Sequence, residues 1–98
     1  MKKHFIAAVY AEGAHGGIIT LKDDGFYFTA HKIMTVPARY AKVMFPYEEI
    51  ENFSFNPIAH MGGVYPAVTI VLKNGKQHDF LISNPKRFFK YMNIMCCL

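Results

Sequence analysis

The apolar residues of this chain occur in short runs, and within several runs apolar and polar side chains alternate. In residues 26–31, Phe26, Phe28 and Ala30 fall on one side and the residues between them on the other. A period of two is typical of a strand with one buried face. The first run, residues 5–11, has only the minimum length of a secretory signal, so a first strand is the favoured interpretation.

Turn residues separate the runs and set their boundaries. Asp-Gly at 24–25 and Asn-Gly at 74–75 predict tight hairpins, because glycine supplies the positive φ that these turns require. Longer connections are predicted at residues 13–17, 32–41 and 57–66. The seven predicted strands are residues 5–12, 18–22, 26–31, 42–47, 51–56, 67–72 and 77–83.

After the last predicted strand the apolar period changes to that of a helix. Asn84 is a good N-cap, and Pro85 suits the first helical position. Phe88, Met92 and Met95 recur at i, i+4 and i+7 and form one apolar face. We therefore predict an amphipathic helix of about 11–13 residues that packs on the strands. A basic helix of this kind can also lie on a membrane, which is the less favoured interpretation.

Composition indicates one folded domain over residues 1–98. Of these residues, 52% are hydrophobic and 18% are charged, which is too apolar for a disordered segment and sufficient for a single core. Apolar positions of the strands should supply that core. The predicted core residues are Phe26, Phe28, Phe45, Ile50, Phe53, Phe55, Val68, Ile70, Leu72, Phe80 and Ile82.

Three segments resemble a known family. They are Leu-Lys-Asp-Asp-Gly-Phe-Tyr-Phe at 21–28, Phe-Pro-Tyr-Glu-Glu-Ile at 45–50 and Ile-Val-Leu-Lys-Asn-Gly-Lys at 70–76. Their order and spacing are similar to those of GRAM-type and bacterial PH-like domains, which belong to the pleckstrin-homology superfold. The resemblance implies a seven-stranded antiparallel barrel or orthogonal sandwich that the helix caps. It also implies a binding module for lipids or proteins rather than an enzyme.

No set of residues has the spacing of a catalytic or metal site. The five histidines lie on different segments, and none is paired at the i, i+4 spacing of a helical metal site. Ser54 and Ser83 lack the glycine-flanked nucleophile motif. Cys96 and Cys97 are two ligands short of a structural zinc site. We therefore expect no enzymatic activity, no cofactor and no bound metal.

The charge pattern leaves one candidate site. Lys and Arg number 11 against 7 Asp and Glu, but they are dispersed and include only two Arg, which argues against specific nucleic-acid binding. The resemblance implies that three loops surround the open end of the barrel, and the first of them, residues 12–17, has no Lys or Arg. Tight phosphoinositide binding is therefore not expected. The candidate residues for an anionic ligand are Lys32, Arg39, Lys42, Lys73 and Lys76.

Two functions of different classes remain. The favoured hypothesis is a non-catalytic module that binds a protein partner or forms a homo-oligomer, because exposed aromatic and Met side chains are typical of interfaces. The alternative is weak binding to anionic lipid or a membrane surface at the open end of the barrel. We expect a bacterial cytoplasmic protein, attached peripherally to a membrane under the alternative. The aromatic and Met residues expected outside the core are Tyr27, Met34, Tyr40, Met44, Met61 and Tyr65.

Overall fold

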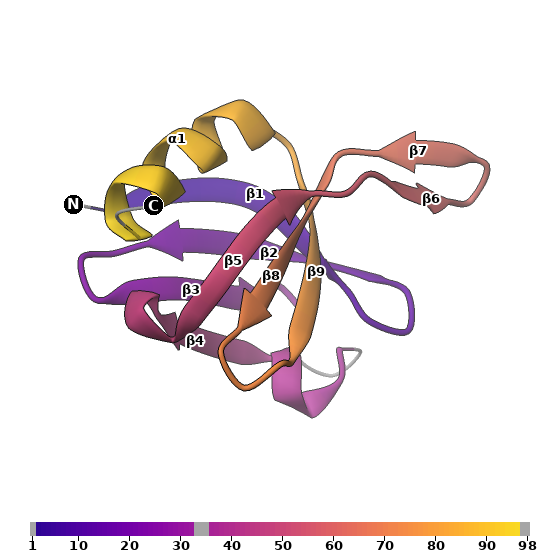
Figure 1. The fold of residues 1–98 in the computed structure, drawn as a ribbon. Helices are drawn as coiled ribbons and strands as arrows, with labels where there is room; N and C mark the ends of the chain where they lie inside the picture. The colour runs from indigo at the N-terminus through magenta and orange to yellow at the C-terminus, as the bar shows by residue number, and fades with distance from the viewer. Residues whose placement is uncertain (1, 33–35, 97–98) are drawn as a thin grey trace.

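The structure is a computed structural model that describes residues 2–32 and 36–96. It is built mainly from β-strands with one C-terminal helix (Figure 1), as the sequence predicts at this level. The helix is α1 (Pro85–Cys96), and the short 3-10 turns are η1 (Ala38–Tyr40) and η2 (Tyr47–Glu49). The strands are β1 (Lys3–Tyr10), β2 (Ala14–Leu21), β3 (Gly25–Ala30), β4 (Lys42–Pro46), β5 (Ile50–Phe55), β6 (Ile58–His60), β7 (Gly63–Tyr65), β8 (Ala67–Leu72) and β9 (Gln77–Ile82).

Seven of these strands form one antiparallel sheet in the order β4-β3-β2-β1-β9-β8-β5. The β1–β9 pairing, from Ala7↔Ile82 to Val9↔Phe80, joins the β1–β4 meander to the β5-β8-β9 group. Figure 1 shows these two groups crossing each other in two layers, with α1 over one end. The expected closure into a barrel is wrong, because β4 and β5 lie at opposite ends of the strand order and are not paired within the described chain. The turn η2 carries the chain from the β4 layer to the other, where β5 pairs with β8 instead.

Aromatic side chains fill the space between the layers and the helix. The Phe26 ring lies 5.1 Å from the ring of Phe80 and 6.2 Å from that of Phe88. Most of the predicted core is confirmed, and Phe53 and Leu72 are partly buried against it. The predicted core residues that are buried are Phe26, Phe28, Phe45, Ile50, Val68, Ile70, Phe80 and Ile82.

Two predictions about burial are wrong. Phe55 is 50% exposed although its strand alternation placed it in the core, because it lies at the end of β5 and lines an open groove beside α1 instead of the core. Tyr40 is 7% exposed although it was expected outside, because η1 turns its ring against the ring of His78. Tyr27 is partly buried.

Other predictions of exposure are borne out where the structure describes the residue. Met44, Met61 and Tyr65 are exposed. Met34 lies outside the described residues.

Two segments predicted as connections are strands. β2 begins at Ala14, and the turn before it is made by Glu12 and Gly13, whose φ values are 56° and 105°. Residues 57–66 contain the β6–β7 hairpin, with Met61 and Gly62 at positive φ in its turn. Neither turn carries the Asn-Gly or Asp-Gly pair that makes such a hairpin easy to recognise in a sequence.

The C-terminal helix is confirmed at its predicted position. The backbone N–H of Arg87 donates to Asn84 Oδ1 at 3.2 Å, which is the N-cap interaction that the sequence predicts. Phe88 and Met92 are fully buried, and Met95 packs partly buried against the core. Within the described residues, no helix has both the length and the apolar character needed to cross a membrane.

Candidate functional site

The structure separates the five cations of the candidate site. Arg39 and Lys76 line one pocket of about 560 Å³. Lys32 lines a different pocket, beside His15 and His31. Lys42 and Lys73 belong to the lining of neither pocket. Of the five predicted cations, therefore, only Arg39 and Lys76 line one pocket together, and the five do not form one basic site.

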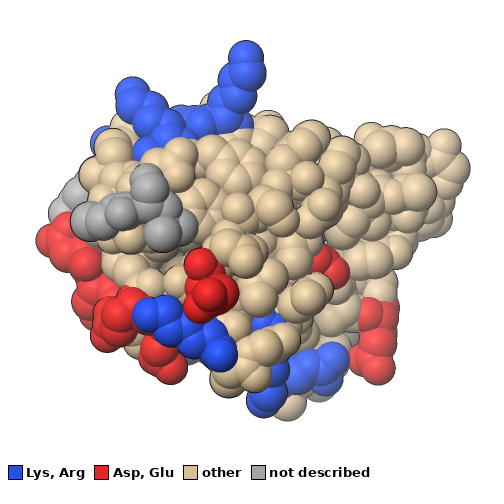
Figure 2. Space-filling view, viewed as in Figure 1, with Lys and Arg blue, Asp and Glu red and all other residues tan. Residues whose placement is uncertain are grey.

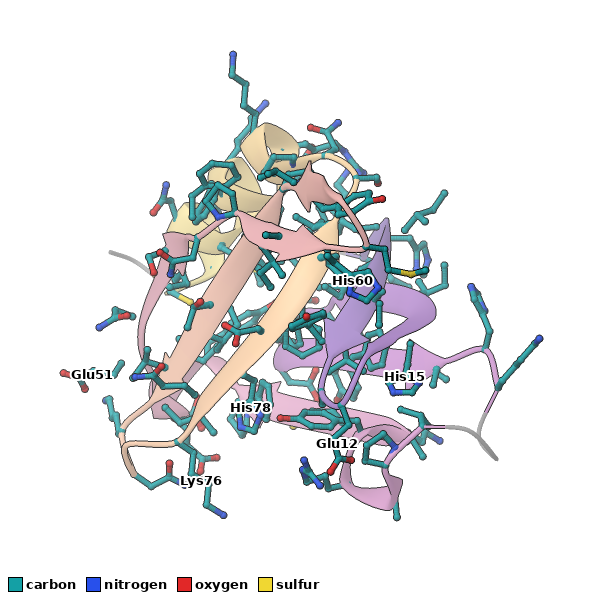
Figure 3. All side chains as sticks on the ribbon, turned by 90° about the vertical axis from the view of Figure 1, so that its right-hand side faces the viewer. Glu12, His15, Glu51, His60, Lys76 and His78 are labelled. Carbon is teal, nitrogen blue, oxygen red and sulfur yellow. The ribbon has the colours of Figure 1, made fainter. Side chains whose placement is uncertain are left out.

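The Arg39–Lys76 pocket lies where η1 and β4 face the β8–β9 turn. That turn is tight, because Gly75 adopts a φ of 88° and Asn74 Oδ1 accepts the backbone N–H of Lys76 at 2.9 Å. Figure 3 shows Lys76 pointing outward at the rim, while His78 lies further in against the strands. The lining residues are Arg39, Tyr40, Val43, Phe45, Leu72, Asn74, Lys76, Gln77 and His78.

His78 forms the inner wall of this pocket. Its Nδ1 shares a 2.5 Å hydrogen bond with the Tyr40 hydroxyl, and its ring stacks on the Phe45 ring at 4.9 Å between centroids. His78 Nε2 is buried and has no hydrogen-bond partner in the described part of the chain. A buried polar atom without a hydrogen-bond partner lowers the stability of a fold, so Nε2 of His78 is a position where the protein itself leaves a hydrogen bond unmade.

Burial is the main cause that holds the pKa of His78 below its ordinary value of 6.5. The positive charges of Lys76 and Arg39 lower the pKa further, and the negative charge of Asp79 acts in the opposite direction. Below pH 6.5, the unfolded chain therefore binds more protons at this position than the folded chain does at the same pH. This contribution to stability is complete above the unfolded pKa and is lost as the pH falls toward the folded pKa.

We predict that stability falls as the pH is lowered through this window, and that His78 causes part of the fall. Urea unfolding at about pH 7.5 and about pH 5.5 measures the difference. In His78→Phe the difference between the two pH values should be smaller than in the wild type, whatever the absolute stability of the variant. An equal difference in both proteins would contradict the assignment.

A second candidate surface follows the free edge of β5. The N–H of Asn56 donates to the Ala67 oxygen of the neighbouring chain segment at 2.9 Å. Because hydrogen-bonded and non-hydrogen-bonded pairs alternate in an antiparallel ladder, the backbone N–H and C=O groups of Phe53 and Phe55 face away from β8. A bulge between Ile50 and Asn52 interrupts the start of the strand, so the regular free edge runs over residues 52–55.

An apolar groove of about 530 Å³ lies beside this edge, between the end of β5 and α1. The rings of Phe53 and Phe89 stack at 5.6 Å and join the strand to the helix next to the groove. In Figure 2 positive side chains stand above α1, while the surface below it is mostly uncharged. The groove is lined by Phe55, Pro85, Lys86, Phe89, Lys90 and Asn93.

Sequence reasoning missed residues at both surfaces. His78 and Lys76 are two positions apart across the start of β9, and that spacing could have placed them on one side. Nothing in the sequence indicates that Tyr40 meets His78, since 38 positions separate them. Phe89 was passed over because the helical period assigned the core face to Phe88.

The titratable residues do not gather into a metal site in the described residues. No group of three or more His, Cys, Asp or Glu side chains there is placed to hold a metal ion. His60 on the β6–β7 hairpin packs edge-on against Tyr10 at 5.5 Å. Figure 3 shows His15, His60 and His78 well separated from one another.

No protein-family model and no curated protein sequence matches the chain. Among solved structures, it is similar to the C-terminal domain of an unknown protein from Leishmania infantum, with a TM-score of 0.77. The match covers 98% of this chain and 83% of that one at 12% sequence identity. At this identity the likeness concerns the fold alone.

Proposed function

We propose that this chain is a non-catalytic protein-binding module of the PH/GRAM-like type. It binds an extended peptide segment of a partner as an additional strand along β5. The proposal rests on one observation: two features occur together on one side of β5, namely outward-facing backbone groups and an apolar groove. The order of the elements, with seven sheet strands followed by a helix, supports the PH/GRAM-like assignment.

The backbone of residues 52–55 supplies the general part of the recognition. An unpaired edge strand offers N–H and C=O groups at the spacing that an extended peptide needs, and strand addition is a common mode of peptide binding. Phe53 and Phe55 direct these groups outward in the ladder pattern. Main-chain hydrogen bonds provide affinity with little dependence on the peptide sequence.

The groove supplies the selective part. Alternate side chains of an added strand point to the same face, so one apolar side chain of the peptide reaches the surface between Phe55 and Phe89. Lys86 and Lys90 line the same groove, and their ammonium groups favour an acidic neighbour in the peptide. We therefore expect a peptide with an apolar anchor and Asp or Glu close to it.

A different protein suits this surface better than a second copy of the chain. The chain carries a net charge of +4, and the groove itself is flanked by two Lys, so like charges oppose self-association at this point. Peripheral binding to a membrane has less support from the structure, because the five candidate cations do not share one surface.

The change Phe55→Ser tests the proposal, since it removes one wall of the groove from a half-exposed position. Random peptides of about ten residues are displayed on phage and selected on the wild-type chain, on Phe55→Ser and on Val64→Ser. Val64 is 73% exposed on the β6–β7 hairpin, so Val64→Ser is a matched loss of exposed apolar surface away from the groove.

We expect acidic peptides with one apolar anchor to be enriched on the wild type and on Val64→Ser, and to bind Phe55→Ser at least about ten-fold more weakly. Chemical-shift mapping of a selected peptide should move the amides of residues 52–55 and 86–93. Absence of enrichment on the wild type, or equal binding to Phe55→Ser, would refute the proposal. A light-scattering mass of two chains would favour self-association instead.

A further inference from the structure

A β-hairpin stands out from the fold and takes no part in the proposed peptide site. It comprises residues 57–66, in which β6 and β7 are joined by a turn at Met61 and Gly62, and we call it the arm. Figure 1 shows the arm extending away from the two layers, beyond the ends of β5 and β8. Met61 is 89% exposed, and Val64 and Tyr65 are exposed as well. Exposed apolar side chains gathered on one projection are typical of an interaction surface.

The arm is held in one direction at its root. The backbone N–H of Ile82 donates to the Pro66 oxygen at 3.1 Å, which ties the end of the arm to β9. On the other side of the hairpin, the ring of His60 packs edge-on against that of Tyr10 on β1. A partner therefore meets a surface that is already in place, and little conformational freedom is lost when the two associate.

The arm lies in the longest part of the chain without charged side chains. Residues 52–72 contain no Lys, Arg, Asp or Glu, although 18% of the whole chain is charged. On the face that Figure 2 shows, the arm is accordingly free of charged residues. The net charge of +4 therefore has no group on the arm through which it could oppose self-association at short range.

An uncharged hollow lies at the foot of the arm. Its volume is about 280 Å³, and it lies beside the β1–β9 pairing, where Ile6 and Leu81 line it. Its described lining contains no Lys, Arg, Asp or Glu. Ile6 is 70% exposed, so a large apolar side chain of the hollow is open to a partner. Tyr65 and Pro66 at the base of the arm form part of its wall, so the arm and the hollow are one continuous surface.

We propose that two copies of the chain form a symmetric dimer, in which the tip of each arm lies in the hollow at the foot of the other arm. In a two-fold dimer both copies use the same surface, so a projection and the hollow that receives it must both occur on one chain. Because the hollow lies at the base of the arm, two antiparallel arms place each tip over the hollow of the other copy. Met61 and Val64 then contact Ile6 and Leu81 of the second copy.

A second copy fits the arm better than a membrane does. Peripheral binding to anionic lipid depends on Lys and Arg side chains close to the inserted segment. In Figure 2 these side chains stand above α1 and along the lower side of the molecule, away from the arm. An uncharged, apolar surface that would receive the tip is already present on the chain itself.

Sedimentation velocity of the full chain at concentrations up to about 1 mM measures the association. The tip variant combines Met61→Asn with Val64→Thr. Asn tolerates the positive φ of the turn, and Thr keeps the β-branched shape of Val, so the hairpin should be retained. The matched control combines Met44→Gln with Ile94→Gln, which also makes two exposed apolar side chains polar, on β4 and α1.

We expect the wild type and the control to dimerise with dissociation constants that agree within about two-fold, and the tip variant to associate at least about ten-fold more weakly. A charge exchange tests which surfaces meet. Val64→Lys and Ile6→Glu should each abolish the dimer, whereas an equimolar mixture of the two variants should restore it, because the introduced charges are opposite and face each other in the mixed dimer. Circular dichroism checks that each variant is folded.

Other results would overturn the inference. A mass of one chain at every concentration, or equal association of the tip variant and the wild type, would exclude the arm as a dimer contact. If the charge-exchange mixture stayed monomeric, the tip and the hollow would not meet. Binding of a monomeric chain to phosphatidylcholine vesicles, lost in the tip variant, would assign the arm to a membrane instead.

The dimer and the peptide site are tested independently, because the hollow and the groove beside β5 share no lining residue. Phe55→Ser should leave the dimer unchanged, and a dimer that this variant does not weaken leaves the groove free for a peptide. A dimer that is lost in Phe55→Ser but kept in the tip variant would place self-association at the groove and contradict both proposals.

Discussion

Replacing Phe88 by alanine is expected to lower the free energy of unfolding by about 3–5 kcal/mol. Phe88 is fully buried, and its ring lies 5.5 Å from that of Phe5, 6.2 Å from that of Phe26 and 5.9 Å from that of Phe89. The alanine variant loses these contacts and leaves a cavity where the helix meets both layers. Since domains of this size are stable by only about 5–15 kcal/mol, the loss is a large part of the total.

Urea unfolding followed by circular dichroism measures this effect. Ile94→Ala is the matched control, because Ile94 lies on the same helix and is 58% exposed. Its free energy of unfolding should stay within about 0.5 kcal/mol of the wild-type value. A loss below about 1 kcal/mol in Phe88→Ala would mean that α1 does not close the core as the structure describes.

The second large effect is expected from Gly17→Ala. A Cβ at Gly17 would lie 2.4 Å from the backbone oxygen of Thr29 and 2.7 Å from the Phe28 ring. The Thr29 oxygen belongs to β3, which pairs with β2 at this point, so relief of the clash requires the two strands to separate or slip. We expect a loss of about 1–3 kcal/mol, typical of overpacking in a tight core.

Gly16→Ala is the control for Gly17→Ala, because it adds the same atom one position earlier in the same strand. The nearest atom to a Cβ at Gly16 is His31 Cδ2 at 3.6 Å, which is an ordinary contact. Its stability should therefore change little, or rise by about 0.4–1 kcal/mol through the lower entropy of the unfolded chain. Equal effects of the two substitutions would show that the close approach at Gly17 is not tight.

The positions of most elements could be predicted because their signals are local. The Asn-Gly turn at 74–75 and the Asn84 cap each depend on a few neighbouring residues, and the structure has both. The β6–β7 hairpin was missed because Met61 and Gly62 make its turn without the usual residue pair. The start of β2 was missed because glycines at 16 and 17 look like a loop until their neighbours are known.

The candidate sites could be predicted only in part. The sequence and its resemblance selected Arg39 and Lys76, but they also selected three cations that lie outside the shared pocket. Tyr40 and His78 meet through a long-range contact that no local pattern describes. Phe55 follows the alternation of its strand, yet it is half exposed and lines a groove with residues of α1, so the groove depends on how α1 packs beside β5.

By itself the sequence determined the β-rich class, the C-terminal helix and most of the core, because periodicity and turn chemistry act over a few residues. Tertiary structure alone decided that the sheet stays open, since β5 pairs with β8 rather than β4. It also decided which cations share a pocket and which strand edge lies beside an apolar groove. These features depend on how segments that are far apart in the chain pack together, and local patterns of side chains do not show which distant segments meet.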